Sequence, residues 1–175
     1  MNKIIDKIGA ASLPDEINVI IEIPMNSDPI KYEIDKESGL MQVDRFMNVA
    51  MRYPCNYGYI PHTLASDGDP LDALVICQYP LIPGCFLKAR PIGVLMMEDE
   101  SGIDEKILAL PTLKADPFFA GINDIEHLSD VTKQRIKHFF EHYKDLEKNK
   151  WVKVQDWLNA SKAKELILKY LAAYV

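Results

Sequence analysis

Residues 17–23 read INVIIEI and residues 30–34 read IKYEI, two short runs in which apolar side chains recur at every second position. A period of two places neighbouring side chains on opposite faces of a β-strand. In the first run the odd-numbered positions are all apolar, whereas Glu22 lies on the other face and Pro24 ends the run. The two runs therefore predict two strands that each offer an apolar face to a core.

The second run carries charge on the face opposite to its apolar side chains, where Lys31 and Glu33 lie together. An ordinary ion pair is one explanation of that pairing, and a binding role for Lys31 is another. The turn residues at 38–39, Ser and Gly, predict a hairpin into a third strand at 40–46, with Arg45 near its end.

Beyond the hairpin, residues 53–70 are rich in Pro, Gly, Asn, Ser and Asp, which predicts a long irregular segment of the kind that carries function. Further strands are predicted at 71–77, at 85–97 with a break at Pro91, and at 106–110, after an acidic loop at 98–105. The first two thirds of the chain should therefore be mostly β.

The last third changes to a period of three and four, which is typical of helices. One helix is predicted at 130–147, capped by Ser129 or Asp130. A second helix follows a cap at Asn159 or Ser161, after a short strand around residues 152–154. Strands followed by helices favour an α+β fold, built as a small closed barrel.

Length and composition limit the possible classes of protein. A chain of 175 residues predicts one domain, residues 1–175, and its 48% hydrophobic and 26% charged content is that of an ordinary globular protein. The net charge of -6 argues against binding to nucleic acid or to an anionic membrane. Three cysteines without a CxxC pair, and no apolar run of about 18 residues, favour a cytoplasmic protein with reduced thiols.

Two acidic clusters are the sharpest chemical feature of the sequence. Residues 67–73 read DGDPLDA, so that Asp67, Asp69 and Asp72 lie within six residues, and a second cluster at 98–105 contains Asp99 and Asp104. Carboxylates this close raise one another's pKa unless a cation lies between them. A solvated acidic turn explains one such cluster. Two clusters favour a metal site.

Magnesium fits this spacing better than calcium. An EF-hand loop that began at Asp67 would need Gly at its sixth position and Glu at its twelfth, where this chain has Asp72 and Gln78. Magnesium accepts one or two carboxylates and completes its shell with water and substrate phosphate oxygens.

Basic and phenolic side chains supply possible donors to a polyanionic substrate, although each one taken singly is also explained as a surface charge or a half-buried aromatic ring. They are Lys31, Arg45, Lys106, Lys144, Tyr53, Tyr57 and Tyr143. Basic donors among clustered acids suggest metal-assisted phosphoryl chemistry.

Other chemistries find little support. The sequence has no G-x-x-x-x-G-K-[ST], G-x-G-x-x-G or G-x-S-x-G motif, and no base is identified for Cys55. His138 to His142 read HFFEH, which fits the zinc motif H-x-x-E-H. That match is short and would leave both acidic clusters unexplained, so a surface or subunit-contact pair is the better interpretation of the two histidines.

The chain resembles a known family, the soluble family I inorganic pyrophosphatases, and in particular their bacterial branch. Residues 67–73 fit the signature D-[SGDN]-D-[PE]-[LIVMF]-D-[LIVMGAC]. The runs IEIPMNSDPIKYEIDKESG, YPCNYGYIPHTL and HFFEHYKDLEK are also similar to the bacterial enzymes. The resemblance implies a five-stranded OB-like barrel flanked by two C-terminal helices, several Mg²⁺ ions per site, hydrolysis of diphosphate to two orthophosphates, and a homohexamer.

The resemblance also implies a role for individual residues. Asp67, Asp72 and Asp104 would hold the principal metals, Asp99 would help to bind a further one, and Asp69 would be the general base. Lys31 and Tyr57 would contact the phosphoryl group under attack, whereas Arg45, Tyr143 and Lys144 would hold the leaving phosphate. The surrounding polar positions would be Glu22, Glu33, Tyr53 and Lys106. In this hypothesis Asp72 bridges two metals that share one water, Asp69 takes the proton, and no covalent intermediate forms.

Overall fold

The computed structural model describes residues 8–9, 12–35 and 37–174. Its strands and helices follow one another in the order β1 (Ile17–Ile23), β2 (Ile30–Ile34), β3 (Met41–Phe46), β4 (Asn56–Tyr59), β5 (Asp72–Val75), β6 (Phe86–Asp99), β7 (Gly102–Pro111), η2 (Pro117–Phe119), η3 (Ile125–His127), α1 (Asp130–His142), β8 (Val152–Asn159) and α2 (Ala160–Ala173).

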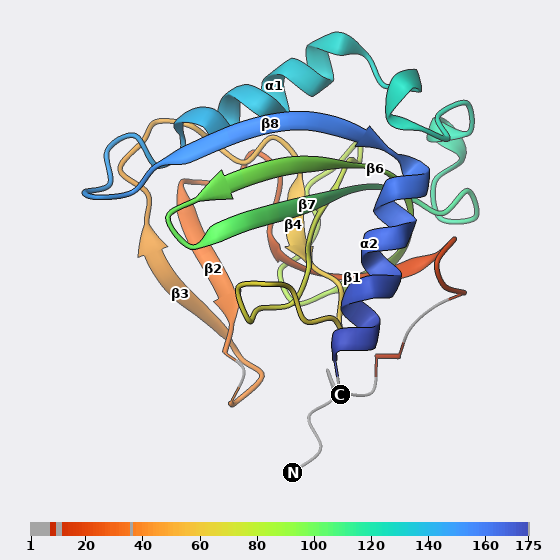
Figure 1. Cartoon of the computed structure of the whole chain (residues 1–175), viewed down its shortest axis with the longest axis horizontal. Helices are drawn as coiled ribbons and strands as arrows, with labels where there is room; N and C mark the ends of the chain where they lie inside the picture. Colours follow the sequence, from red (N-terminus) through yellow and green to blue (C-terminus); the bar gives the residue numbers. More distant parts are fainter. Residues whose placement is uncertain (1–7, 10–11, 36, 175) are drawn as a thin grey trace.

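Five strands pair in a closed ring, because β1 pairs with β4 along one edge and with β6 along the other. The order around the ring is β1-β4-β5-β7-β6, and β8 extends the sheet beyond β6. Only β5 and β7 run parallel within this sheet, as far as the described strands go. With α1 along β8 and α2 beside the ring, this is the predicted α+β, OB-like barrel with two C-terminal helices (Figure 1).

The strand β1 is enclosed on both faces, since all seven of its residues are buried. Ile17 and Ile21 belong to a core that α2 completes with Ile167, whereas Ile23 belongs to a second core that α1 completes with Phe139. Burying one such side chain stabilises the fold by about 1.5–3 kcal/mol. Because both faces are covered, Glu22 is buried as well.

The strands β2 and β3 form a separate antiparallel hairpin, as the sequence predicts. It lies on the side of the barrel away from α2 (Figure 1). Its register places Lys31 directly opposite Arg45, next to a bulge between Lys31 and Tyr32. Two positive charges on neighbouring strands repel, so each requires a nearby acid.

Three predictions between residues 53 and 105 are wrong. The segment 53–70 is not irregular throughout, because it contains β4, which pairs with β1 and β5. The acidic stretch 98–105 is not a loop, since Asp99 ends β6 and Asp104 lies in β7. Cross-strand pairing fixes both carboxylates on a rigid hairpin, a long-range effect that local composition does not reveal. At Pro91 the strand continues through a bulge instead of breaking.

The helix α1 is shorter than predicted, and β8 is longer. The side chain of Ser129 caps α1, and the helix ends at His142 instead of residue 147. Leu146, which the apolar periodicity placed on the helix, is exposed, so no packing favours further turns. β8 runs for eight residues beside β6 up to Asn159, which caps α2.

None of the helices in the described part of the chain has the length and hydrophobicity that a bilayer span needs. Cys55, Cys77 and Cys85 are unpaired thiols, as predicted. Burial raises the pKa of Cys55 to about 12, which makes it an inert core side chain.

Candidate active site

A cavity of about 620 Å³ opens between the barrel, the β2–β3 hairpin and the segment that follows α1. Every side chain that the sequence predicted for the site lines this cavity. They are Glu22, Lys31, Glu33, Arg45, Tyr53, Tyr57, Asp67, Asp69, Asp72, Asp99, Asp104, Lys106, Tyr143 and Lys144.

The loop between β4 and β5 carries the first acidic cluster, and a buried threonine holds its two ends together. The Thr63 hydroxyl donates to the carbonyl of Ile60 at 2.6 Å and accepts from the Leu71 amide at 2.8 Å. The Leu64 amide donates to the carbonyl of Tyr170 in α2 at 3.0 Å. The loop is therefore attached both to the barrel and to the last helix.

Within this loop, Gly68 has a φ of +87°, a conformation that favours glycine. The turn lets the Asp69 amide donate to Asp67 Oδ1 at 3.0 Å. Asp67 and Asp69 therefore lie side by side at the rim, while Asp72 enters β5 and points inward. In the sequence D-G-D-P-L-D, the first two aspartates therefore lie in a turn and the third lies in a strand.

The ammonium group of Lys106 lies between two of the predicted metal ligands. The parallel register of β5 and β7 places Asp72 opposite Lys106, which contacts Asp72 and lies 2.7 Å from Asp104. Burial would lower the pKa of Lys106, but the charges of the two aspartates outweigh it and raise that pKa well above its usual value. Burial raises the pKa of Asp72 in spite of the lysine, so Asp72 is incompletely neutralised.

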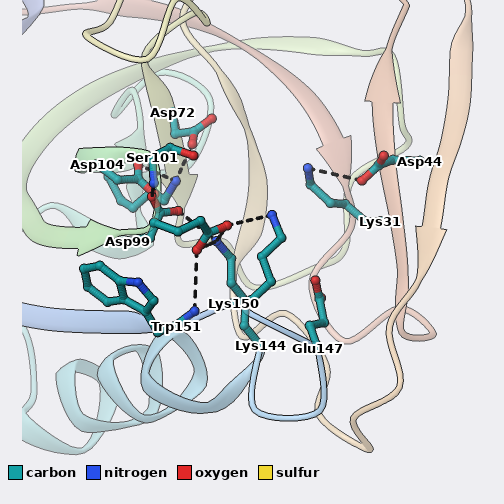
Figure 2. A network of polar contacts seen from close by, with 12 residues as sticks. Lys31, Asp44, Asp72, Asp99, Ser101, Asp104, Lys144, Glu147, Lys150 and Trp151 are labelled. Atoms are coloured by element: carbon teal, nitrogen blue, oxygen red, sulfur yellow. Dashed lines mark hydrogen bonds and ion pairs between the residues drawn. The ribbon is translucent and has the colours of Figure 1, made fainter.

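The two acidic clusters form two acidic walls of the cavity, and the second wall lies at the β6–β7 turn (Figure 2). Lys144 Nζ lies 2.8 Å from Asp99 and 3.4 Å from Glu100, and Lys150 Nζ lies 2.6 Å from Glu100. Burial would raise the pKa of Glu100, but the Lys150 hydrogen bond and other contacts lower it to about 2. Lys144 reaches this wall because the chain leaves the helix just before it.

Lys31 lies on the other side of the view in Figure 2 from Asp72 and Asp104, and Arg45 also lines the cavity. Lys31 pairs with Glu33 and lies 3.4 Å from Asp44. Arg45 lies 2.7 Å from Asp44 and 3.2 Å from Glu147. The Lys31–Glu33 contact confirms the ordinary ion pair that the sequence suggested. Lys31 and Glu33 also line the cavity, where a ligand can reach them.

The tyrosines form the floor of the cavity. Tyr53 and Tyr57 are almost completely buried, with ring centroids 5.2 Å apart, and Tyr53 packs on Phe139 of α1. Burial raises the pKa of both phenols well above the usual value, so their hydroxyls stay protonated. The Tyr57 hydroxyl is hydrogen-bonded to Asp72. Tyr143 packs against Phe139 in the same aromatic group.

Glu22 is the most deeply buried acid of the site. Its side chain accepts a hydrogen bond from the Ile34 amide at 2.8 Å and so links β1 to the hairpin. Burial raises the pKa of Glu22 to about 8, and the neighbouring charge of Asp72 acts in the same direction. This carboxyl group is therefore neutral near neutral pH in the absence of a further cation.

Sequence reasoning missed several residues that line the cavity, among them Tyr59, His62, Glu100 and Lys150. Glu100 belongs to the predicted acidic cluster, so its charge was a usable signal. Lys150 enters through the turn after α1, in which Asn149 has a positive φ. No local pattern marks that turn as part of a site, because its contact with Glu100 spans fifty residues of chain.

The acidic walls fit divalent cations. Acidic side chains outnumber basic ones around the cavity, and Asp72 and Asp104 already reach one and the same positive group. Among the described residues no three of these carboxylates converge within 4.8 Å, since lysines hold them in pairs. A cavity lined by carboxylate oxygens suits hard ions such as Mg²⁺.

Comparisons with known proteins agree with this geometry. Residues 19–175 match the model of the family described as inorganic pyrophosphatase. An inorganic pyrophosphatase of Rickettsia conorii is 65% identical over 163 residues, which cover 93% of this chain and 94% of that protein. A solved structure of the inorganic pyrophosphatase from Helicobacter pylori has a TM-score of 0.93 and 50% identity, covering 96% of this chain and 98% of that one.

A third relative is the inorganic pyrophosphatase of Thermus thermophilus, with a TM-score of 0.90, 42% identity and 95% of both chains covered. Together with the acidic, lysine-bridged cavity, these matches place the protein among the hydrolases of phosphoric anhydrides. The chain belongs to the inorganic pyrophosphatase family, whose members hydrolyse pyrophosphate. The family implies a requirement for a divalent metal.

Proposed function

We propose that the protein hydrolyses pyrophosphate to two orthophosphates with Mg²⁺, by direct attack of water and without a covalent intermediate. One observation carries the proposal: a single cavity is lined by both acidic clusters, by the basic donors and by the tyrosines. Among the described residues no cysteine lines this cavity, and Cys55 is a buried thiol with a raised pKa. A thiol nucleophile therefore has no support.

The charge of the cavity supports the need for metal. Pyrophosphate is a polyanion, and a cavity in which acids outnumber bases repels it. The residues that would hold the cations are Asp67, Asp72 and Asp104, with Asp99 for a further ion. When bound, such ions lower the pKa of a coordinated water and neutralise charge on the phosphoryl oxygens.

Asp69 is assigned as the general base. It lies beside Asp67 at the rim of the cavity, on the loop that Thr63 and Tyr170 hold in place. A fixed backbone keeps its carboxylate within the site, where it takes a proton from the attacking water. Such placement is worth about 10²–10⁴ in rate.

Basic side chains hold the substrate. Lys31 and the Tyr57 hydroxyl contact the phosphoryl group under attack, whereas Arg45, Tyr143 and Lys144 hold the leaving phosphate. Lys144 and Arg45 are paired with Asp99 and Glu147 in the structure, so the substrate competes with these acids for its donors. Charge-assisted hydrogen bonds to phosphate favour that exchange. Four further residues support the site, namely Glu22, Glu33, Tyr53 and Lys106.

Three further proposals concern the whole chain. It forms a single catalytic domain, residues 1–175, in keeping with its length, and acts in the cytoplasm on its small-molecule substrate, in keeping with its cysteines. It assembles as a homohexamer, as the family resemblance implies. It needs no nucleic acid or membrane as a partner, in keeping with the net charge of -6.

A phosphate-release assay tests the function. Pyrophosphate with Mg²⁺ should yield two orthophosphates per molecule, and EDTA should stop the reaction because the acidic walls then repel the substrate. A control with excess Mg²⁺ added after EDTA should restore the rate. If the protein bound cations but released no phosphate, it would be a metal-binding module without hydrolase activity, and the proposal would be contradicted.

A further inference from the structure

A buried hydrogen bond outside the cavity joins the last turns of α2 to β7. The hydroxyl of Tyr170 donates to Glu105 Oε1 at 2.8 Å, and both side chains are buried. The ring of Tyr170 belongs to the core that also contains Ile60 and Leu71, which flank the acidic loop between β4 and β5. Neither Tyr170 nor Glu105 lines the cavity, so the proposed hydrolysis gives them no direct role.

Glu105 lies in β7 between two residues of the site. Neighbouring side chains of a strand point to opposite faces, so Asp104 and Lys106 face the cavity while Glu105 faces α2. A carboxyl group among apolar side chains is costly unless it is hydrogen-bonded. The position of Glu105 therefore requires a donor, and Tyr170 supplies it.

Tyr170 also holds the acidic loop, which lies beside the C-terminal end of α2 (Figure 1). Its carbonyl accepts from the Leu64 amide at 3.0 Å, and its hydroxyl lies 3.4 Å from Ser66 Oγ. The carbonyl is free for this contact because the Tyr174 amide, its usual partner four residues further on, donates to the Leu171 carbonyl at 3.2 Å instead. Tyr170 therefore contacts the loop and β7 at the same time.

These contacts reach the part of the loop that carries the acids. Asp67 and Asp69 are exposed, so packing does little to fix them. Instead the loop closes on itself, since the Ala65 amide donates to the Asp69 carbonyl at 2.7 Å and the Gly68 amide donates to the Ala65 carbonyl at 3.1 Å. A turn closed in this way moves as one body, and its attachment to Tyr170 sets the position of both aspartates.

We propose that Tyr170 is a positioning residue for the metal site. Through its hydrogen bond to Glu105 it ties the loop of Asp67 to the strand of Asp104, and so holds two of the proposed metal ligands in place before any ion binds. A cation then loses less binding free energy to the ordering of its ligands. The inference rests on the proposed function only in that Asp67 and Asp104 serve there as metal ligands.

Hydrogen exchange in the metal-free full chain tests the attachment directly. Tyr170→Phe keeps the ring and removes only the hydroxyl, and Glu105→Met removes the acceptor. In both variants we expect the amides of residues 64–69 to exchange about 2–10-fold faster, the range that one hydrogen bond is worth. Glu105→Gln retains an acceptor oxygen and should keep the wild-type rates.

Ile167→Val is the matched control, because it removes one buried methyl group from the same helix and leaves the hydrogen bonds of Tyr170 in place. The loop exchanges by local opening, whereas β1 is exposed only by global unfolding. Ile167→Val should therefore speed exchange in β1 and leave the loop amides unchanged.

Mn²⁺ binding, measured by calorimetry without substrate, gives a readout that a merely structural role would not move. The affinity should fall about 2–10-fold in Tyr170→Phe and Glu105→Met, and stay at the wild-type value in Glu105→Gln and Ile167→Val. In the phosphate-release assay, the half-saturating Mg²⁺ concentration should rise by the same factor. Turnover at saturating Mg²⁺ should stay within about twofold, because the ions then hold the loop themselves.

Unchanged loop exchange or unchanged Mn²⁺ affinity in Tyr170→Phe would overturn the proposal, since the hydroxyl would then serve stability alone. Circular dichroism verifies that each variant folds, and if Tyr170→Phe does not, Glu105→Met decides by the same two measurements. Neither measurement needs pyrophosphate, so a wild-type protein that released no phosphate would contradict the proposed function alone.

Discussion

At the scale of single residues, Lys106 is the centre of the acidic site. Its ammonium contacts Asp72 and Asp104, which belong to neighbouring parallel strands, and it is almost completely buried. A lysine in that position keeps the two carboxylates close without a metal. It does not compensate them fully, because the pKa of Asp72 remains raised by burial. A further positive charge beside Asp72 would lower this pKa.

Asp69→Asn tests the assignment of the general base. The amide keeps the size of the side chain, and the turn depends on the Asp69 backbone, so the fold should be retained. Turnover with saturating Mg²⁺ should fall by about 10²–10⁴, as expected when a placed base is lost. Initial rates of phosphate release measure the change, with Glu165→Gln as an exposed control. A full rate in Asp69→Asn would reject the assignment.

Glu22 predicts a dependence of stability on pH. Its folded-state pKa is raised from 4.5 to about 8 by burial, so between these values the unfolded chain releases a proton that the folded chain keeps. Stability therefore falls as pH rises through this window, by at most about 1.4 kcal/mol per pH unit from this group. Glu22→Gln, which keeps an oxygen for the Ile34 amide, should remove that fall.

Urea unfolding in EDTA at pH 5 and pH 8 measures this effect. The difference in unfolding free energy between Glu22→Gln and wild type should increase towards pH 8. Equal differences at both values would show that the Glu22 carboxyl titrates normally in the fold.

Residue types in the sequence predicted which side chains line the cavity, and the structure supplied the contacts among them. The spacing of Asp67, Asp69 and Asp72 identified the acidic loop, and all three line the cavity. No local signal could show that Lys106 bridges two acids, because this contact depends on the parallel pairing of β5 and β7. Lys150 was missed as a site residue for the same reason, since a turn far along the chain brings it to Glu100.

At the scale of elements, the pattern in β1 and β2 predicted their bounds correctly, because apolar residues occupy every second position of each strand. β4 escaped prediction because its residues, Asn56–Tyr59, lie among turn formers. The helix α1 ends where its buried stripe ends, and that early end lets Lys144 turn towards Asp99. Tertiary packing thus decided the boundaries that periodicity left open.

Gly58 is the position at which β4 can least tolerate a side chain. A Cβ there would lie 1.8 Å from the backbone oxygen of Ile20 in β1, an approach that only a shift of the strand could relieve. Gly58→Ala should therefore lower the unfolding free energy by about 1–3 kcal/mol or more. It should also slow hydrolysis, since β4 carries Tyr57 into the cavity.

Gly121→Ala is the matched control for this substitution. Nothing lies within 4 Å of its added Cβ, and its φ is not positive, so stability should stay the same or rise by about 0.4–1 kcal/mol. Denaturant melts of both variants compare the two effects. Equal stability of the two alanine variants would mean that the close β1–β4 contact does not constrain the barrel.

At the scale of the whole molecule, the closed ring gathers residues from distant parts of the chain around one cavity. β5 and β7 carry the inner acids, the β2–β3 hairpin brings Lys31 and Arg45, and the segment after α1 brings Tyr143 and Lys144. The acidic and basic groups neutralise one another in pairs. We infer that cations and substrate exchange these internal pairs for stronger ones.

The most direct test of this account is the anomalous scattering of Mn²⁺ in crystals of the protein. Mn²⁺ takes the oxygen ligands that suit Mg²⁺ and can be located by its own signal. The account predicts Mn²⁺ ions coordinated by Asp67, Asp72 and Asp104, with Lys106 no longer the sole cation between the last two. A cavity without anomalous peaks, in which Lys106 still bridges Asp72 and Asp104 at saturating Mn²⁺, would contradict it.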